Sequence, residues 1–213
     1  MKKIWITKRL LVMACVALCG VFLNCGDAFA HEMYYINNTP VGVRWNDVTN
    51  RVAKLKMNGD YLQSRHSQFY STTKSIWNAS ARVSITQVSF DSSNIDLATG
   101  TQAFWNEVAG PYTYGFSELY STDRKIVNKN TIKSSSRKIK GANLYYSPEY
   151  ARYQDQIKAV MIHEVGHALG LGHPNDSMYG YNVMDIDSVM RIDADREYTN
   201  LPSHDTNDLN NMY

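Results

Sequence analysis

The sequence predicts an α+β domain, and three observations carry this prediction. Stretches 82–90 and 142–146 alternate apolar and polar residues, as half-buried strands do. Stretches 61–79 and 147–169 instead repeat apolar residues every three to four positions, as buried helices do. No internal repeat, low-complexity tract or linker divides the chain after residue 30. We therefore expect strands and helices to share one core.

Residues 1–30 are typical of a signal peptide. The basic start contains Lys2, Lys3, Lys8 and Arg9, and an apolar run of fourteen residues follows from Leu10 to Leu23. That run is short for a bilayer span. Ala28-Phe29-Ala30 then supplies the small-x-small pattern of a cleavage site. We expect a signal peptide at 1–30, cleavage after Ala30 and a secreted, extracellular domain at 31–213. An uncleaved anchor is the alternative.

The cysteines are consistent with this division. All three, Cys15, Cys19 and Cys25, lie within residues 1–30. The exported domain should therefore fold without disulfides. Lipidation at Cys25 is an alternative, although Asn24 before it fits such processing poorly.

Charge excludes some partners. The full chain carries a net charge of +2, and its first 30 residues hold four bases and one acid, which leaves residues 31–213 near −1. Nothing in this balance favours nucleic acid or a membrane surface. We expect no nucleic-acid partner, no stable membrane association after signal cleavage, and a monomer.

The first half of the domain should begin with a strand at 41–45, in which Trp45 fills core, and continue with the helix at 61–79. The strand at 82–90 slips its alternation at Gln87, which predicts a bulge. The polar segment 91–96 then reads as a solvated turn. A calcium site at Asp91 and Asp96 is the alternative, because calcium prefers clustered oxygens.

The second half holds an aromatic stretch at 101–120, which we expect to form short strands or turns that fill core. A polar, basic stretch at 121–140 predicts a solvated surface loop. Ser147-Pro148-Glu149 has the composition of a helix start and should open the helix that runs to 169. A short final helix is predicted at 203–213, with Leu209 and Met212 facing the core.

The most informative stretch is His163-Glu164-Val165-Gly166-His167-Ala168-Leu169-Gly170-Leu171-Gly172-His173. Two histidines four positions apart lie about 40° apart around a helix, one turn along it, so both can reach one metal ion. Gly170 can end the helix in a left-handed conformation, and His173 can then supply a third nitrogen. Three neutral imidazoles leave a tetrahedral zinc with one open position for water. Glu164 can take the proton from that water as a general base. The plain alternative is a helix with two surface histidines.

This string is the signature of the metzincin metallopeptidases. The chain resembles their secreted bacterial members, closest to the matrixin-like branch, and the looser likeness extends to Val43-Arg44-Trp45, residues 141–146, Ser188-Val189-Met190-Arg191 and residues 206–213. The resemblance implies a zincin-like fold: a twisted mixed sheet with two long helices in an N-terminal subdomain, then a small C-terminal subdomain with a Met-turn and a final helix. It also implies that strand 142–146 is the sheet's edge, where a protein or peptide substrate adds as an extended strand.

Metzincins place a methionine beneath the zinc in a tight turn, and three residues are candidates here: Met178, Met184 and Met190. Ser188-Val189-Met190 followed by the C-terminal pattern matches best, so Met190 is preferred and Met184 comes second. The interval from His173 to Met190 is longer than is usual in matrixins. Any of the three can instead simply fill core.

The predicted function is that of a secreted zinc-dependent endopeptidase. A non-catalytic zinc-containing module that binds peptides is one alternative, although Glu164 would have no use there. A secreted protease directed at a single target is the other, with the same chemistry and a narrower substrate.

Overall fold

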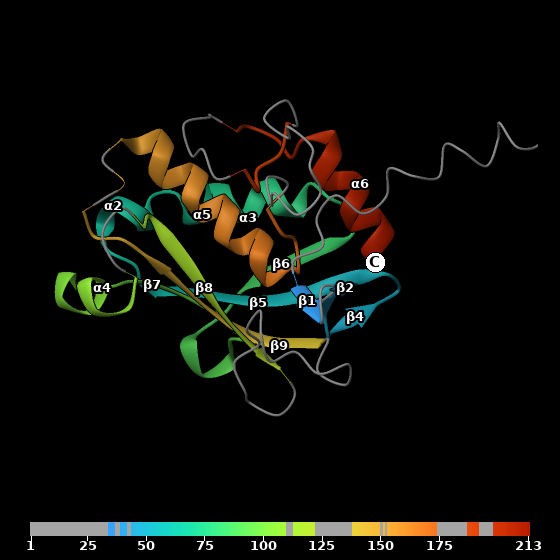
Figure 1. The fold of residues 1–213 in the computed structure, drawn as a ribbon, viewed down its shortest axis with the longest axis horizontal. Helices are drawn as coiled ribbons and strands as arrows, with labels where there is room; N and C mark the ends of the chain where they lie inside the picture. The colour runs from blue at the N-terminus through green and yellow to red at the C-terminus, as the bar shows by residue number, and fades with distance from the viewer. Residues whose placement is uncertain are drawn as a thin grey trace, which may run out of the picture. The chain divides into compact units, whose positions relative to one another are not determined.

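A computed structural model of the protein describes residues 34–36, 39–41, 44–109, 113–121, 138–149, 151, 153–173, 187–191 and 198–213. These residues form a mixed α/β fold in which helices pack against a mostly parallel sheet (Figure 1). The expected signal peptide, Met178, Met184 and most of the basic loop lie outside them. Within the described ranges, no helix has the length and apolarity that crossing a membrane requires.

The strands are β1 Tyr34–Ile36, β2 Thr39–Val41, β3 Arg44–Trp45, β4 Val48–Thr49, β5 Val52–Tyr61, β6 Val83–Gln87, β7 Ile95–Thr99, β8 Gly115–Ser121 and β9 Lys138–Tyr146. The helices are α2 Ser64–Ser67, α3 Tyr70–Asn78, α4 Gln102–Val108, α5 Gln154–Ala168 and α6 Ser203–Met212, with a 3₁₀ turn at Phe90–Ser92. Strands β1 and β2 pair only with each other among the described strands.

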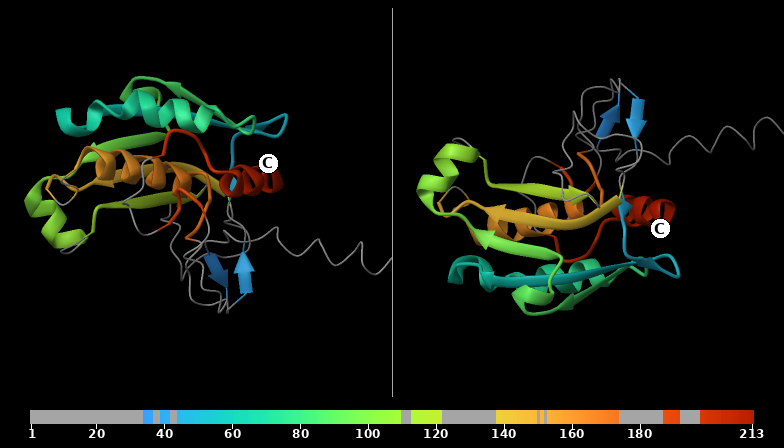
Figure 2. Two further views of the ribbon diagram at one scale, coloured as in Figure 1. Left: turned by 90° about the horizontal axis from the view of Figure 1, so that it is seen from above. Right: turned by 90° about the horizontal axis from the view of Figure 1, so that it is seen from below.

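The main sheet has the strand order β6-β5-β7-β9-β8. Its first four strands run parallel, and β8 runs antiparallel to β9. The short strand β3 pairs with the start of β9, and β4 pairs with the start of β5. Helices α3 and α5 run side by side on one face of this sheet (Figure 2).

The prediction that 142–146 forms the edge of the sheet is wrong. Strand β9 is paired on both sides, by β7 and by β8, and β8 is the outer strand among those described. The burial of Ala142, Leu144 and Tyr146 shows which face of β9 meets the core. It does not identify the strands that pair with β9, and for this reason the sequence pattern could not place β9 within the sheet.

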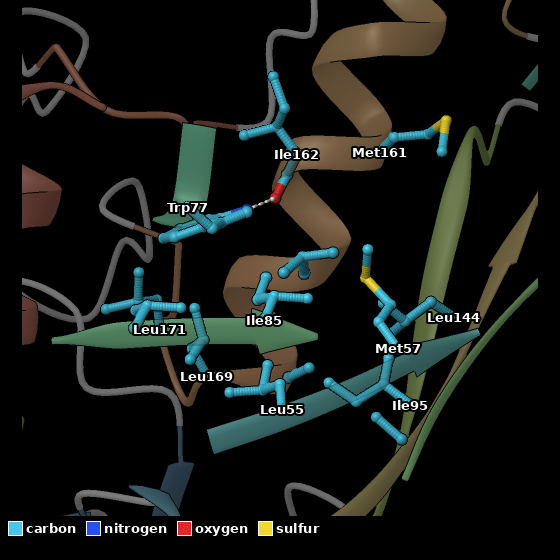
Figure 3. Packing of buried hydrophobic residues seen from close by; sticks show 14 of the residues in the cluster. Leu55, Met57, Trp77, Ile85, Ile95, Leu144, Met161, Ile162, Leu169 and Leu171 are labelled. Carbon is cyan, nitrogen blue, oxygen red and sulfur yellow. Dashed lines mark hydrogen bonds between the residues drawn. The ribbon is translucent and has the colours of Figure 1, made fainter. Parts of the chain in front are cut away.

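The core lies between the sheet and its helices. On β5, Ala53, Leu55 and Met57 point into the core, and this clear alternation lies where no strand was predicted. Trp77 of α3 donates its indole N–H to the carbonyl of Ile162 in α5 (3.1 Å) and so fastens the two helices together (Figure 3). Trp45 is 1% exposed, which confirms its predicted place in the core.

Several predicted element boundaries move. The helix expected at 61–79 begins only at Ser64, because β5 extends to Tyr61, and it is divided into α2 and α3. Strand β6 ends at Gln87 and no bulge is found there. Strand β7 follows directly on the polar turn and was not predicted. The aromatic stretch contains helix α4, whose first turn is capped by Thr101 accepting from the N–H of Phe104 (3.2 Å).

The start of α5 is also corrected. This helix begins at Gln154, not at Ser147-Pro148-Glu149. The hydroxyl of Ser147 accepts from the N–H of Glu149 (3.2 Å) within a local turn, and Arg65 of α2 donates to the carbonyls of Pro148 and Ala151. Bonds to another element therefore replace the helical bonds expected there. Helix α6 agrees with the prediction, and Leu209 is fully buried.

Candidate metal centre

Helix α5 ends as the glycine pattern predicts. Gly170 has φ 97°, in the left-handed region that side chains disfavour. The N–H of Leu171 donates to the carbonyl of Gly166 (3.0 Å), and the N–H of Gly170 donates to the carbonyl of His167 (2.9 Å). The chain thereby turns back under the end of its own helix. This turn carries His173 toward the two helical histidines.

The three predicted histidines come together. The Nε2 of His173 lies 3.0 Å from the Nε2 of His163 and 3.1 Å from that of His167. One ligand atom from each histidine lies within 4.8 Å of the others. Tetrahedral zinc with bonds of about 2.05 Å spaces its ligand atoms about 3.3 Å apart. The separations found here are close to that spacing.

Hydrogen bonds at Nδ1 fix the tautomers of two of the rings. The Nδ1 of His163 lies 3.0 Å from the carbonyl of Val189, and the Nδ1 of His167 lies 2.9 Å from that of Leu171. A carbonyl only accepts, so each Nδ1 carries the proton and each Nε2 keeps its lone pair. Burial lowers the pKa of His163 to about 3, and nearby His173 lowers it as well. His163 is therefore neutral at pH 7, and three imidazole nitrogens form a donor set that fits a zinc ion.

Glu164 lies beside this cluster, 4% exposed. Its Oε2 accepts from the hydroxyl of Ser117 on β8 (2.5 Å). Burial raises the pKa of Glu164 to about 7, and the Ser117 hydrogen bond opposes that rise. A carboxyl group with a pKa near neutrality can both accept and return a proton at physiological pH.

Met190 packs against α5 at Gly166, the residue before His167. It lies in the turn 188–191, is fully buried, and touches the helix at Gly166. A Cβ added to Gly166 would lie 2.2 Å from the Met190 Sδ, so only glycine leaves room for this sulfur. Of the three methionines considered, only Met190 lies within the described residues.

Two residues of this region were missed from the sequence. Asp205 of α6 is fully buried and binds the turn that holds Met190. Asp205 lies four positions before Leu209, and this spacing places both residues on the same, inward face of the helix. The spacing could therefore have indicated from the sequence that Asp205 is buried. Ser117 had no such signal, because its contact with Glu164 joins residues 47 positions apart.

The alternative calcium site stays a prediction. In the described part of the chain, the three histidines are the one group of three or more His, Cys, Asp or Glu side chains that could hold a metal ion. Asp91 and Asp96 are not in that group. The carboxylate of Asp96 instead accepts from the hydroxyl of Ser93 (2.6 Å) across the turn.

Comparisons with known proteins add no relative: no family model and no curated protein matches the chain. The class must therefore come from the fold and the site. The chain has three histidines within metal-binding distance on an α/β fold, an arrangement compatible with a zincin.

Proposed function

We propose that this protein is an exported zinc-dependent endopeptidase of the metzincin, matrixin-like kind. The observation that carries the proposal is the convergence of three imidazole Nε2 atoms beside the buried carboxylate of Glu164. A binding module needs the nitrogens alone. A hydrolase needs the adjacent base as well.

His163, His167 and His173 would hold the zinc ion. Zinc bound by three imidazoles acts as a Lewis acid, which polarises a carbonyl and lowers the pKa of water toward neutrality. The carbonyls of Val189 and Leu171 keep two of the ligand rings in the required tautomer.

Glu164 would act as the general base. Its carboxylate accepts a proton from the attacking water and later delivers that proton to the leaving amine, so that one group serves both halves of the reaction. The raised pKa of about 7 suits both transfers. Such a base contributes roughly 10²- to 10⁴-fold to the rate.

The substrate would be a protein or peptide that pairs with β8 as an extended strand. The N–H of Ser147 donates to the carbonyl of Tyr114 (2.9 Å), which fixes the alternation of bonds between β8 and β9. By that alternation, the main-chain groups of Gly115, Ser117 and Leu119 point away from β9 toward the outer edge. Main-chain pairing there tolerates many side chains. Export, a monomeric state and the lack of a nucleic-acid partner belong to the same proposal.

Peptide cleavage by the purified protein tests the proposal. Wild type, Glu164→Ala and the exposed-site control Glu107→Ala would be loaded with zinc, their zinc content measured, and each incubated with a broad panel of unfolded proteins. We expect one zinc per chain in all three. Glu164→Ala should cleave roughly 10²- to 10⁴-fold more slowly than the other two.

Each other outcome has a distinct meaning. Stoichiometric zinc without cleavage of any substrate would favour a peptide-binding module or a protease with one target. A protein that holds no zinc would remove the basis of the proposal. Equal cleavage rates for wild type and Glu164→Ala would show that Glu164 is not the general base.

A further inference from the structure

We propose that Ser117 is a positioning residue that fixes the carboxylate of Glu164 and couples it to the outer strand of the sheet. The inference rests on the proposed function, since it assigns a partner to the proposed base. Ser117 lies on β8, whereas Glu164 lies on α5, so the contact joins the sheet to the helix that carries the histidines.

The contact is well suited to hold a carboxylate. The Ser117 hydroxyl lies 2.5 Å from Oε2 of Glu164 and 3.3 Å from its main-chain carbonyl. A hydroxyl has one proton to donate, and the charged oxygen at the shorter distance is its stronger acceptor. Among the described residues, Ser117 is the one side chain that donates to this carboxylate at hydrogen-bond distance. Because Glu164 is 4% exposed, bulk water cannot easily take the place of the Ser117 hydroxyl if a substitution removes it.

The other carboxylate oxygen of Glu164, Oε1, is restrained by close packing against β8. A Cβ added at Gly115 would lie 2.7 Å from Oε1 of Glu164 and 2.7 Å from a methyl group of Val160. The carboxylate thus rests directly on the backbone of β8 at Gly115, while Ser117 holds its second oxygen. Two residues of one strand, spaced by two and therefore on the same face, fix both oxygens.

Ser117 also faces the proposed substrate with its main chain. Its side chain points toward α5, whereas its N–H and carbonyl point to the outer edge by the alternation with β9. A peptide that pairs with this edge would therefore bond the same residue that holds the base. Ser117 would therefore position both the main chain of the substrate and the carboxylate that accepts the proton.

Four proteins test this assignment: wild type, Ser117→Ala, Ser117→Thr and the control Ser84→Ala, which makes the same truncation on β6. Zinc content and thermal midpoint would be measured first. Then kcat and KM for one peptide would be determined, together with the affinity for acetohydroxamate by calorimetry. Acetohydroxamate chelates zinc and carries a hydroxyl that can donate to the base, so it reports on Glu164 without turnover.

We expect Ser117→Ala to keep its zinc and its KM but to lose about tenfold in kcat and about tenfold in acetohydroxamate affinity, as the loss of a hydrogen bond to a charged group implies. Ser117→Thr keeps the hydroxyl and should restore both values to within about threefold of wild type. Ser84→Ala should match wild type throughout. A merely structural role for Ser117 would instead lower zinc content and thermal midpoint, and threonine would not restore the rate.

Unchanged kcat and unchanged acetohydroxamate affinity in Ser117→Ala would overturn the assignment, as would failure of threonine to restore them. If wild type binds zinc but cleaves no substrate of the panel, that result bears on the proposed function alone and favours a peptide-binding module or a protease with one target. The acetohydroxamate comparison then still decides whether Ser117 positions Glu164, because that measurement requires only bound zinc.

Discussion

The main-chain N–H of Val189 donates to the Oδ2 of Asp205, at 2.9 Å. The other carboxylate oxygen accepts from the hydroxyl of Ser188 (2.6 Å), and that hydroxyl accepts from the N–H of Met190 (2.9 Å). The carbonyl of Val189 in turn accepts from Nδ1 of His163 (3.0 Å). Helix α6 therefore holds, through one buried carboxylate, the turn that orients a candidate metal ligand.

Replacing Asp205 should weaken metal binding from a distance. Asp205→Ala leaves the Val189 N–H and the Ser188 hydroxyl without their acceptor, which costs about 1–3 kcal/mol for each group. Loss of such outer support lowers metal affinity roughly 10- to 100-fold. Zinc competition with a chromogenic chelator and urea unfolding would measure the two effects. Asn207→Ala, an exposed change on the same helix, serves as the control and should alter neither. Unchanged zinc affinity in Asp205→Ala would refute the link.

His66 gives a prediction about pH. It is 1% exposed, its Nδ1 lies 3.2 Å from the hydroxyl of Thr99, and its ring stacks on Tyr146 at 5.8 Å. Burial, assisted by the charge of Arg65, lowers the pKa of His66 to about 4. Below its ordinary pKa of 6.5 the unfolded chain binds a proton that the folded chain refuses. The stability from His66 is thus present above pH 6.5 and is lost as pH falls toward 4.

The measurement is the free energy of unfolding of wild type and His66→Gln from pH 7.5 to pH 4. The difference between them should shift by roughly 3 kcal/mol in favour of the variant as pH falls. Taking the difference between the two proteins cancels the contributions of the other histidines, which both proteins share. Parallel curves would show that His66 does not contribute in this way.

The contact between Gly166 and Met190 can be tested by a pair of substitutions. In Gly166→Ala the new methyl group meets the Met190 Sδ at 2.2 Å and Trp77 at 3.1 Å, so overpacking should cost about 1–3 kcal/mol despite alanine's better helix propensity. Met190→Ala removes the sulfur. In that background Gly166→Ala should cost at least about 1 kcal/mol less, as expected for two residues in contact.

Urea unfolding of the four proteins measures this coupling. Additive costs of the two substitutions would mean that Met190 does not pack against Gly166 in solution. This result would also weaken the choice of Met190 for the Met-turn.

Substrate pairing with β8 predicts a period of two in the substrate. Methylation of a peptide's main-chain nitrogens, one at a time, removes one donor in each case. Methylation at peptide positions that face Gly115, Ser117 or Leu119 should raise KM about tenfold or more. Methylation at the alternate positions should leave KM unchanged. Kinetics on the methylated series would reveal the pattern. Sensitivity without alternation would argue against strand addition.

The sequence by itself determined the candidate site's inner residues. His163, Glu164 and His167 are placed by helix geometry, which depends only on spacing along the chain. Gly170 was identified for a backbone conformation, and it adopts that conformation with φ 97°. Helix α6 likewise follows from its own apolar spacing. Each of these features depends on interactions within a few residues, and such interactions can be deduced from sequence patterns.

Only the tertiary structure decided what surrounds those residues. Among the described strands, β8 rather than β9 lies outermost, and this order depends on pairings between segments far apart in the chain. Alternation in one strand does not identify its neighbours. The same holds for Ser117 against Glu164, Asp205 against Val189 and Met190 against Gly166. It also holds for the start of α5, where Arg65 takes the carbonyls that a longer helix would have used. The spacing along the chain placed the candidate ligands, and the packing of distant segments placed the groups that hold them.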